Sequence, residues 1–337
     1  MAEPHAKTLS DMPAPVLDVV MKEVDLKTVQ SVRKVCSNLR NHADSIQLDA
    51  KILKAYVYIQ SSEKISLELK TADSLFEISY YKDGNDVLVD HDGQKRVENQ
   101  DIANCAGQDL GSILKNQKSI VRAISLILPQ IYAGEVVTDF LTKMSDALES
   151  RKSKLMLKYF SWTGHINEDQ ILSILEKLDP GTINKIDLTN SSGVQMTCNI
   201  NRIVNTDQWK KAKVVETLGF IAETPMSNFY KFRNAHFRIE NVNVDEILTV
   251  RQSALKNANF KEFHFSYENF IDESQFLDRF GKQHKIFKRK NKCWFYKFPM
   301  NDNALVVTWK ENRIRFLRVE PKNFEKFLVP EDKLVVL

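Results

Sequence analysis

Short apolar runs with strand character recur along the second half of the sequence, and stretches with helical spacing separate them. Helical spacing covers 168–178 and 244–257. The runs recur at roughly 25 to 30 residues, the interval expected when one strand and one helix form each repeat of a solenoid. This interval predicts a parallel sheet connected by helices. The strand-like runs are 155–160, 183–188, 214–218, 237–239 and 263–265.

The repeats share little residue identity, so the predicted sheet is like a degenerate leucine-rich repeat. The C-terminal part returns to antiparallel character, with strand-like runs at 293–298, 304–309 and 314–319. Turns at 301–303 and 310–312 join these runs, and the three strands are expected to close the open end of the sheet.

From Ala55 to Asp101 apolar residues alternate with polar ones, and Asp-Gly and Ser-Ser turns interrupt the alternation. This pattern predicts an antiparallel meander. The segment from Gln100 to Glu149 is expected to be helical throughout. Its apolar positions are Leu110, Ile113, Leu114, Ile120, Ile124, Leu128, Val136, Phe140, Met144 and Leu148.

The segment from Leu9 to Asp44 contains three short helical periods. Pro13 stands where a missing N–H is harmless, and Asp25 offers a cap for the second helix. Three helices in so few residues make a minimal core. Such a module leaves apolar surface open, which usually indicates a partner.

The composition of the chain limits the class of partner that it is expected to bind. The chain has 43% hydrophobic and 27% charged residues, and 48 basic residues face 44 acidic ones for a net charge of +4. The balance disfavours nucleic acid as the main partner. A basic run from Lys282 to Lys292 is interpreted as a solvated loop before a strand, with phosphate contact as the alternative.

No stretch is long and apolar enough for a membrane span, and Met1 to Ser10 lacks the apolar part of a secretion signal. We therefore expect a location in the cytoplasm and/or nucleus and no membrane partner. Four scattered cysteines indicate reduced thiols rather than a disulfide frame or a zinc site, so no metal or cofactor is expected. They are Cys36, Cys105, Cys198 and Cys293.

Enzymatic signatures such as GxGxxG, GxSxG and HExxH are missing, and the chain has only ten glycines. We expect no catalytic residues. Trp162, His165 and Asp169 suggest an acid/base site of a hydrolase as a minor alternative, but a turn into a helix capped by Asn167 is favoured.

Two further segments allow two interpretations each. The segment from Trp209 to Lys213 could form a basic, aromatic binding surface. A solvated loop before a strand is the favoured interpretation. His236 and His264 fall at the same phase of two strand-like runs and line either a recognition surface or the core. Phe237, Phe263 and Phe265 are expected in the core.

The segment LSDMPAPVLDVVMKEVDLKTVQSVRKVCSNLRNHAD, Leu9 to Asp44, closely resembles an F-box. Met12-Pro13 stands in the Leu-Pro position, and the apolar series and the Asp25 turn match in spacing. The sequence departs from the usual pattern at Leu39, where a Trp is common, and at Pro15, where an acidic residue is common. The matching residues after Pro13 are Val16, Leu17, Val20, Met21, Val24, Asp25, Val29, Val32, Arg33, Val35, Cys36 and Arg40.

The remainder resembles the FTH domain, which is paired with an F-box in a large family of nematode proteins. The resemblance lies in ILEKLDPGTINKIDL (174–188), DQWKKAKVV (207–215) and HFRIENVNVDEILTVRQSALKNANF (236–260). It implies a substrate-receptor subunit of a Skp–cullin–F-box ubiquitin ligase, which binds the Skp adaptor through the F-box and an unidentified protein substrate through the FTH domain.

The expected fold class is therefore mixed α/β: a three-helix F-box followed by a leucine-rich-repeat-like β/α solenoid with antiparallel strands at its ends. The expected divisions are 9–48, 52–100, 101–285 and 286–337. A non-degradative scaffold or translational regulator is the alternative function. The resemblance implies Skp-adaptor contacts at Met12, Pro13, Val16, Leu17, Val20, Val24 and Val35.

Overall fold

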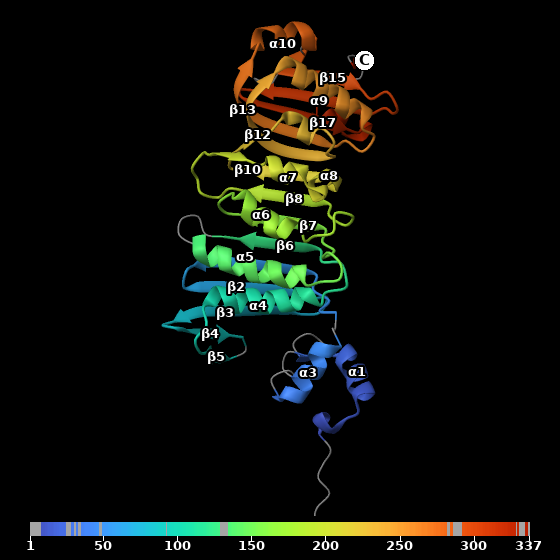
Figure 1. Cartoon of the computed structure of the whole chain (residues 1–337). Helices are drawn as coiled ribbons and strands as arrows, with labels where there is room; N and C mark the ends of the chain where they lie inside the picture. Colours follow the sequence, from blue (N-terminus) through green and yellow to red (C-terminus); the bar gives the residue numbers. More distant parts are fainter. Residues whose placement is uncertain are drawn as a thin grey trace, which may run out of the picture. The chain divides into compact units, whose positions relative to one another are not determined.

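The chain forms two units, each built on a sheet with helices (Figure 1). The first comprises Met1–Lys158 and Lys177–Thr182, and the second comprises Tyr159–Glu176 and Ile183–Leu337. The mixed α/β class is thereby confirmed. The computed structural model describes residues 8–24, 28–29, 32, 35–46, 49–91, 93–128, 134–281, 284–285, 292–327, 329 and 334–335.

A small helical module opens the first unit. It contains a 3-10 turn η1 (Leu9–Asp11), helix α1 (Ala14–Glu23) and helix α3 (Ser37–Ser45). Residues four apart on each helix share a face, so Leu17 and Met21 of α1 pack against Leu39 and Ala43 of α3. Most of the expected middle helix, with Asp25 and Arg33, lies outside the described residues.

The predicted antiparallel meander is confirmed. Five consecutive strands pair antiparallel, and one face of each longer strand is buried in alternation. The strands are β1 (Lys54–Ser61), β2 (Lys64–Lys70), β3 (Leu75–Asp83), β4 (Asp86–Asp90) and β5 (Gln94–Val97).

The prediction of continuous helix from Gln100 to Glu149 was wrong in its middle. Helices α4 (Ile102–Lys115) and α5 (Gly134–Glu149) flank strand β6 (Ala123–Ile127), which pairs parallel with β1. Ile124 lies in this strand, and four consecutive residues of β6 are buried. A strand buried on both faces has a continuous apolar run, which periodicity cannot distinguish from a buried helix.

One buried amide joins the segment after α4 to the start of the meander. The Gln117 side chain is 1% exposed. Its Oε1 accepts a hydrogen bond from the Ile52 N–H at 3.0 Å, and its Nε2 donates to the Ile52 carbonyl at 3.2 Å and to the Ser119 carbonyl at 3.0 Å. The side chain thus satisfies buried backbone groups that the sheet leaves unpaired.

Replacing this amide with an apolar side chain of similar size is expected to destabilise the first unit. Gln117→Leu leaves the Ile52 N–H and carbonyl without partners, which should lower the free energy of unfolding by about 2 kcal/mol. Urea unfolding checks this value. Gln94→Leu, at an exposed position of β5, is the control and should change it by less than about 0.5 kcal/mol. Equal stability of the two variants would contradict this role.

The second unit contains a parallel sheet in which neighbouring strands follow chain order. Its strands pair in the order β7, β8, β10, β12, β13, and each of these pairs is parallel. The predicted run 155–160 is shifted in the structure, because the strand begins at Tyr159. The strands are β7 (Tyr159–Thr163), β8 (Lys185–Thr189), β10 (Val214–Leu218), β12 (Asn234–Asn243) and β13 (Glu262–Ile271).

Helical segments connect these strands. Phe237, Phe263 and Phe265 are at most 1% exposed, which confirms them as core residues. Two very short strands, β9 (Thr197–Asn199) and β11 (Ile221–Glu223), form a separate pair. The connecting helices are α6 (Glu168–Leu175), α7 (Asn201–Asn205), α8 (Asp207–Lys211), η2 (Met226–Phe229) and α9 (Val244–Lys256).

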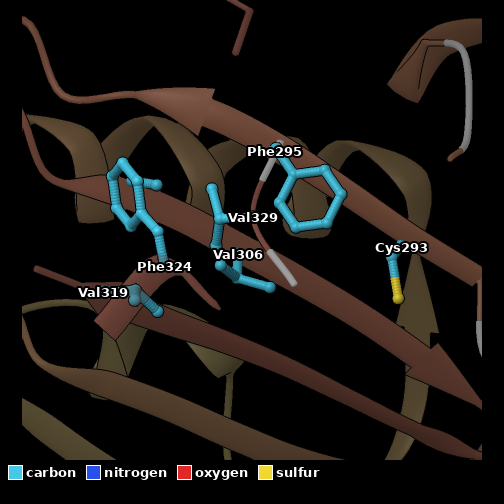
Figure 2. Packing of buried hydrophobic residues seen from close by; sticks show 7 residues of the cluster. Cys293, Phe295, Val306, Val319, Phe324 and Val329 are labelled. Carbon is cyan, nitrogen blue, oxygen red and sulfur yellow. The ribbon is translucent and has the colours of Figure 1, made fainter. Parts of the chain in front are cut away.

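Antiparallel strands continue the sheet beyond β13, as predicted. Strand β17 pairs antiparallel with β13, and β16, β15 and β14 follow. A cluster of seven buried residues, including Phe295 and Phe324, packs on one face of these strands (Figure 2). The elements are α10 (Glu273–Phe280), β14 (His284–Lys285), β15 (Lys292–Lys297), β16 (Ala304–Lys310), β17 (Arg313–Val319), η3 (Pro321–Asn323) and α11 (Phe324–Phe327).

Candidate protein-interaction surfaces

Helix α1 divides its apolar side chains between two faces. Leu17 and Met21 face the interior, while Val16, Val19 and Val20 are 43%, 62% and 36% exposed. Positions 16, 19 and 20 follow the i, i+3, i+4 spacing that places residues on one side of a helix. Helix α1 therefore presents an aliphatic stripe to solvent in addition to the stripe that builds the module's core.

The structure separates the seven residues expected to contact the Skp adaptor. Leu17 lies in the module's core at 4% exposed, and Val24 is half-buried at the end of α1. Val19 was missed by the sequence analysis, although its spacing from Val16 was a usable signal. The exposed members of the predicted set are Met12, Pro13, Val16, Val20 and Val35.

The second unit has a polar sheet face, on the side opposite the buried phenylalanines. Three strand pairings align Glu216, His236, His264 and Arg315 in one row across β10, β12, β13 and β17. The imidazole rings of His236 and His264 stack with centroids 4.5 Å apart and an interplanar angle of 21°. The two histidines therefore belong to a surface row rather than to the core.

Both histidines of this row favour the neutral form. Burial, together with the neighbouring His236, lowers the pKa of His264 to about 4. Burial also lowers the pKa of His236, against the opposing effect of Glu216 and Glu262. Near neutral pH the row thus presents two uncharged rings between a carboxylate and a guanidinium.

The residues of the minor hydrolase hypothesis do not assemble into an acid/base pair. The Trp162 Nε1 donates to the His165 carbonyl at 3.0 Å, and Asp169 pairs with Arg202. Asn167 caps α6 by accepting a hydrogen bond from the Gln170 N–H at 3.1 Å, as favoured from the sequence. The geometry gives no support to catalysis at this position.

The described residues show neither a metal-binding cluster nor a membrane-spanning helix. They contain no group of three or more His, Cys, Asp or Glu side chains placed to hold a metal ion. They also contain no helix with the length and apolar character needed to cross a bilayer.

Trp209 to Lys213 forms neither a strand nor an aromatic surface. Residues Asp207–Lys211 form helix α8, capped by the Thr206 hydroxyl, so the expected loop before a strand is present only at Ala212 and Lys213, which precede β10. Trp209 is fully buried, whereas Lys210, Lys211 and Lys213 are exposed. Most of the other basic run, Lys282 to Lys292, lies outside the described residues.

Two segments of the chain match known domain families. Residues 9–51 match the F-box domain, and residues 138–283 match the FTH domain. "F-box A protein 224" of Caenorhabditis elegans is 23% identical over 317 residues, which cover 91% of this chain and 79% of the relative. The F-box match falls on the module with the aliphatic stripe, and the FTH match includes β7 to β13. The F-box match, the FTH match and the similarity to an F-box A protein together support a nematode F-box/FTH protein.

Proposed function

We propose that this chain is a substrate adaptor of a Skp–cullin–F-box ubiquitin ligase. The observation that carries the proposal is the exposed aliphatic surface on a module that matches the F-box, because F-box domains generally bind Skp adaptors. A second apolar stripe on so small a module serves no internal packing, so a partner protein is its natural occupant.

The proposed contact surface consists of exposed residues at the start of the module and along α1. Each aliphatic side chain buried by the partner contributes ~1.5–3 kcal/mol, so a few of them support a stable complex. Leu17 acts indirectly, by holding α1 against α3. The proposed contact residues are Met12, Pro13, Val16, Val19, Val20 and Val35, with Val24 at the margin.

The proposed mechanism is positioning. The adaptor contributes no catalytic group, and proteins with this pair of domains are typically adaptors rather than enzymes. It raises the effective concentration of substrate lysines near a ubiquitin-charged enzyme held by the cullin scaffold. For the FTH region we propose a leucine-rich-repeat-like β/α architecture, supported by the parallel strands in chain order. We also propose the division into 9–48, 52–100, 101–285 and 286–337.

Introducing charge into the aliphatic stripe is expected to abolish adaptor binding. Val16→Asp combined with Val20→Asp removes two apolar contacts and buries two carboxylates, so we expect the Kd for a Skp adaptor to rise by about a hundredfold or more. Isothermal titration calorimetry with purified full-length chain measures this change.

The matched control places the same charges on exposed apolar residues elsewhere. Leu75→Asp combined with Val194→Asp, at positions 55% and 68% exposed, should leave the Kd unchanged. Circular dichroism should show all three proteins equally folded, because the substituted side chains are exposed. The proposal would be wrong if the wild-type chain failed to bind a Skp adaptor. It would also be wrong if the Val16→Asp, Val20→Asp variant bound the adaptor as tightly as the wild-type chain.

The non-degradative alternative predicts a different result in cells. A pure scaffold or translational regulator leaves the half-life of its bound partner unchanged, whereas a ligase adaptor shortens it. Measuring the half-life of a co-purified partner with and without proteasome inhibition separates the two functions.

A further inference from the structure

Basic residues stand directly before three neighbouring parallel strands of the FTH region. Lys213 precedes β10, Arg233 precedes β12 and Lys261 precedes β13. The Arg233 N–H donates to the Lys213 carbonyl at 2.8 Å, and the Lys261 N–H donates to the Arg233 carbonyl at 2.9 Å. The three residues therefore lie side by side at the edge where the strands begin, about 4.8 Å apart per strand.

Two more lysines lie within three residues of this row along the chain, Lys210 before Lys213 and Lys231 before Arg233. Lys210 lies in α8, and the Lys231 Nζ lies 5.2 Å from the centroid of the Phe232 ring. Partial burial, together with the positive charge of Lys210, lowers the pKa of Lys231 to about 8. A neighbouring positive charge disfavours the charged form of a lysine. We call Lys210, Lys213, Lys231, Arg233 and Lys261 the basic edge.

The cations of the basic edge lack acidic partners within the described part of the chain. None of the five forms an ion pair there, whereas Lys185, Arg238 and Arg315 on the polar sheet face pair with Glu216, Glu268 and Glu262. The Arg233 Nε is buried without a hydrogen-bond partner.

One carboxylate lies near an end of the basic edge. Lys322 lowers the pKa of Glu320 most, with a smaller contribution from Lys261, and the ion pair of Glu320 is with Lys322 at 2.7 Å. The edge thus keeps an excess of positive charge, which an anionic ligand would neutralise.

We propose that the basic edge binds an acidic segment of the protein that the chain recruits. This inference rests on the proposed function and specifies the chemistry of the substrate. An extended peptide presents alternate side chains at about 6.6 Å spacing, which flexible lysines on neighbouring strands can follow.

Nucleic acid fits the basic edge less well. Single-stranded nucleic acid binding generally combines cations with exposed aromatic rings on which bases stack. Three rings beside the edge, Trp209, Phe232 and Phe260, are at most 2% exposed, and Tyr230 is half-buried beside Phe263. Cations without an exposed stacking platform favour carboxylates over a nucleotide strand.

A direct binding experiment tests the basic edge. Fluorescence polarisation with full-length chain uses fluorescein-labelled octaglutamate, with octaglutamine and a uridine octamer of the same label as comparison probes. We expect octaglutamate to bind more tightly than both and to weaken as salt rises. Lys210→Glu, Lys213→Glu and Lys261→Glu combined should weaken it on the order of tenfold or more.

The matched control is Lys70→Glu, Lys82→Glu and Lys95→Glu, which changes the net charge equally at exposed positions of the meander. It should retain octaglutamate binding within about twofold. Equal loss in both triple variants, absence of octaglutamate binding, or tighter binding of the uridine octamer would overturn the proposal. Skp-adaptor titration of the same proteins separates the two hypotheses, because the basic-edge variant should keep wild-type adaptor affinity.

Discussion

Trp209→Ala is expected to lower the free energy of unfolding by about 3–5 kcal/mol, the range for truncating a fully buried large aromatic side chain. The indole packs edge-on against Phe229 and Phe232, with ring centroids 5.7 and 5.4 Å away. Its Nε1 donates to the Asn228 carbonyl at 3.2 Å. The substitution therefore creates a cavity and removes the partner of a carbonyl. Urea unfolding followed by circular dichroism measures the loss without relying on tryptophan fluorescence.

Two companion variants make the Trp209 result specific. Trp209→Phe keeps an aromatic ring in the cavity and should lose less stability than Trp209→Ala. Lys210→Ala, at the exposed neighbouring position, should change stability by less than about 0.5 kcal/mol. A loss below about 1 kcal/mol for Trp209→Ala would show that α8 does not anchor this part of the sheet.

Gly219→Ala should destabilise the second unit by about 3–4 kcal/mol, because a steric clash adds to backbone strain. Gly219 follows β10 with a φ of +75°, and an added Cβ would lie 2.0 Å from the Asn190 carbonyl oxygen. The Asn190 N–H also donates to the Leu218 carbonyl at 2.8 Å, and the Asn190 Nδ2 donates to the Gly219 carbonyl at 3.0 Å. Relieving the clash would therefore separate the ends of β8 and β10. Urea unfolding measures the loss.

The chain offers a matched control for this substitution. Gly193 has a φ of +71°, and nothing lies within 4 Å of its added Cβ. Gly193→Ala should therefore show only the cost of the left-handed conformation, about 1 kcal/mol. Equal losses at the two glycines would mean that the strand ends move apart freely.

The sequence predicted those strands that have one polar face or a clear boundary. Strand β10 was predicted with its exact bounds, and β15 to β17 were predicted within one residue at each end. The predicted runs 237–239 and 263–265 lie inside β12 and β13, which are much longer. Strand β6 was missed because both of its faces are buried, so no alternation distinguishes it from a helix. Helix α8 was missed because five residues are too few to show helical periodicity.

The candidate surfaces were harder to predict from the sequence than the fold was. Helical spacing identified the apolar residues of α1, but it did not separate the inward Leu17 from the outward Val16. That distinction depends on where α3 packs. The basic edge depends on strand register: Lys213, Arg233 and Lys261 are far apart in sequence, and backbone hydrogen bonds between strands bring them together.

The described core of the F-box module contains four buried side chains, from Leu17, Met21, Leu39 and Ala43. A core this small contributes little to the free energy of folding. A bound partner would therefore supply a large part of the module's stability. A ligand at a hundred times its Kd adds about 2.7 kcal/mol of stability. Under the proposed function, chains in excess of the Skp adaptor would keep this module loosely ordered, and loosely ordered segments are preferred sites of proteolysis. Cellular abundance of the protein would thereby follow the supply of its partner.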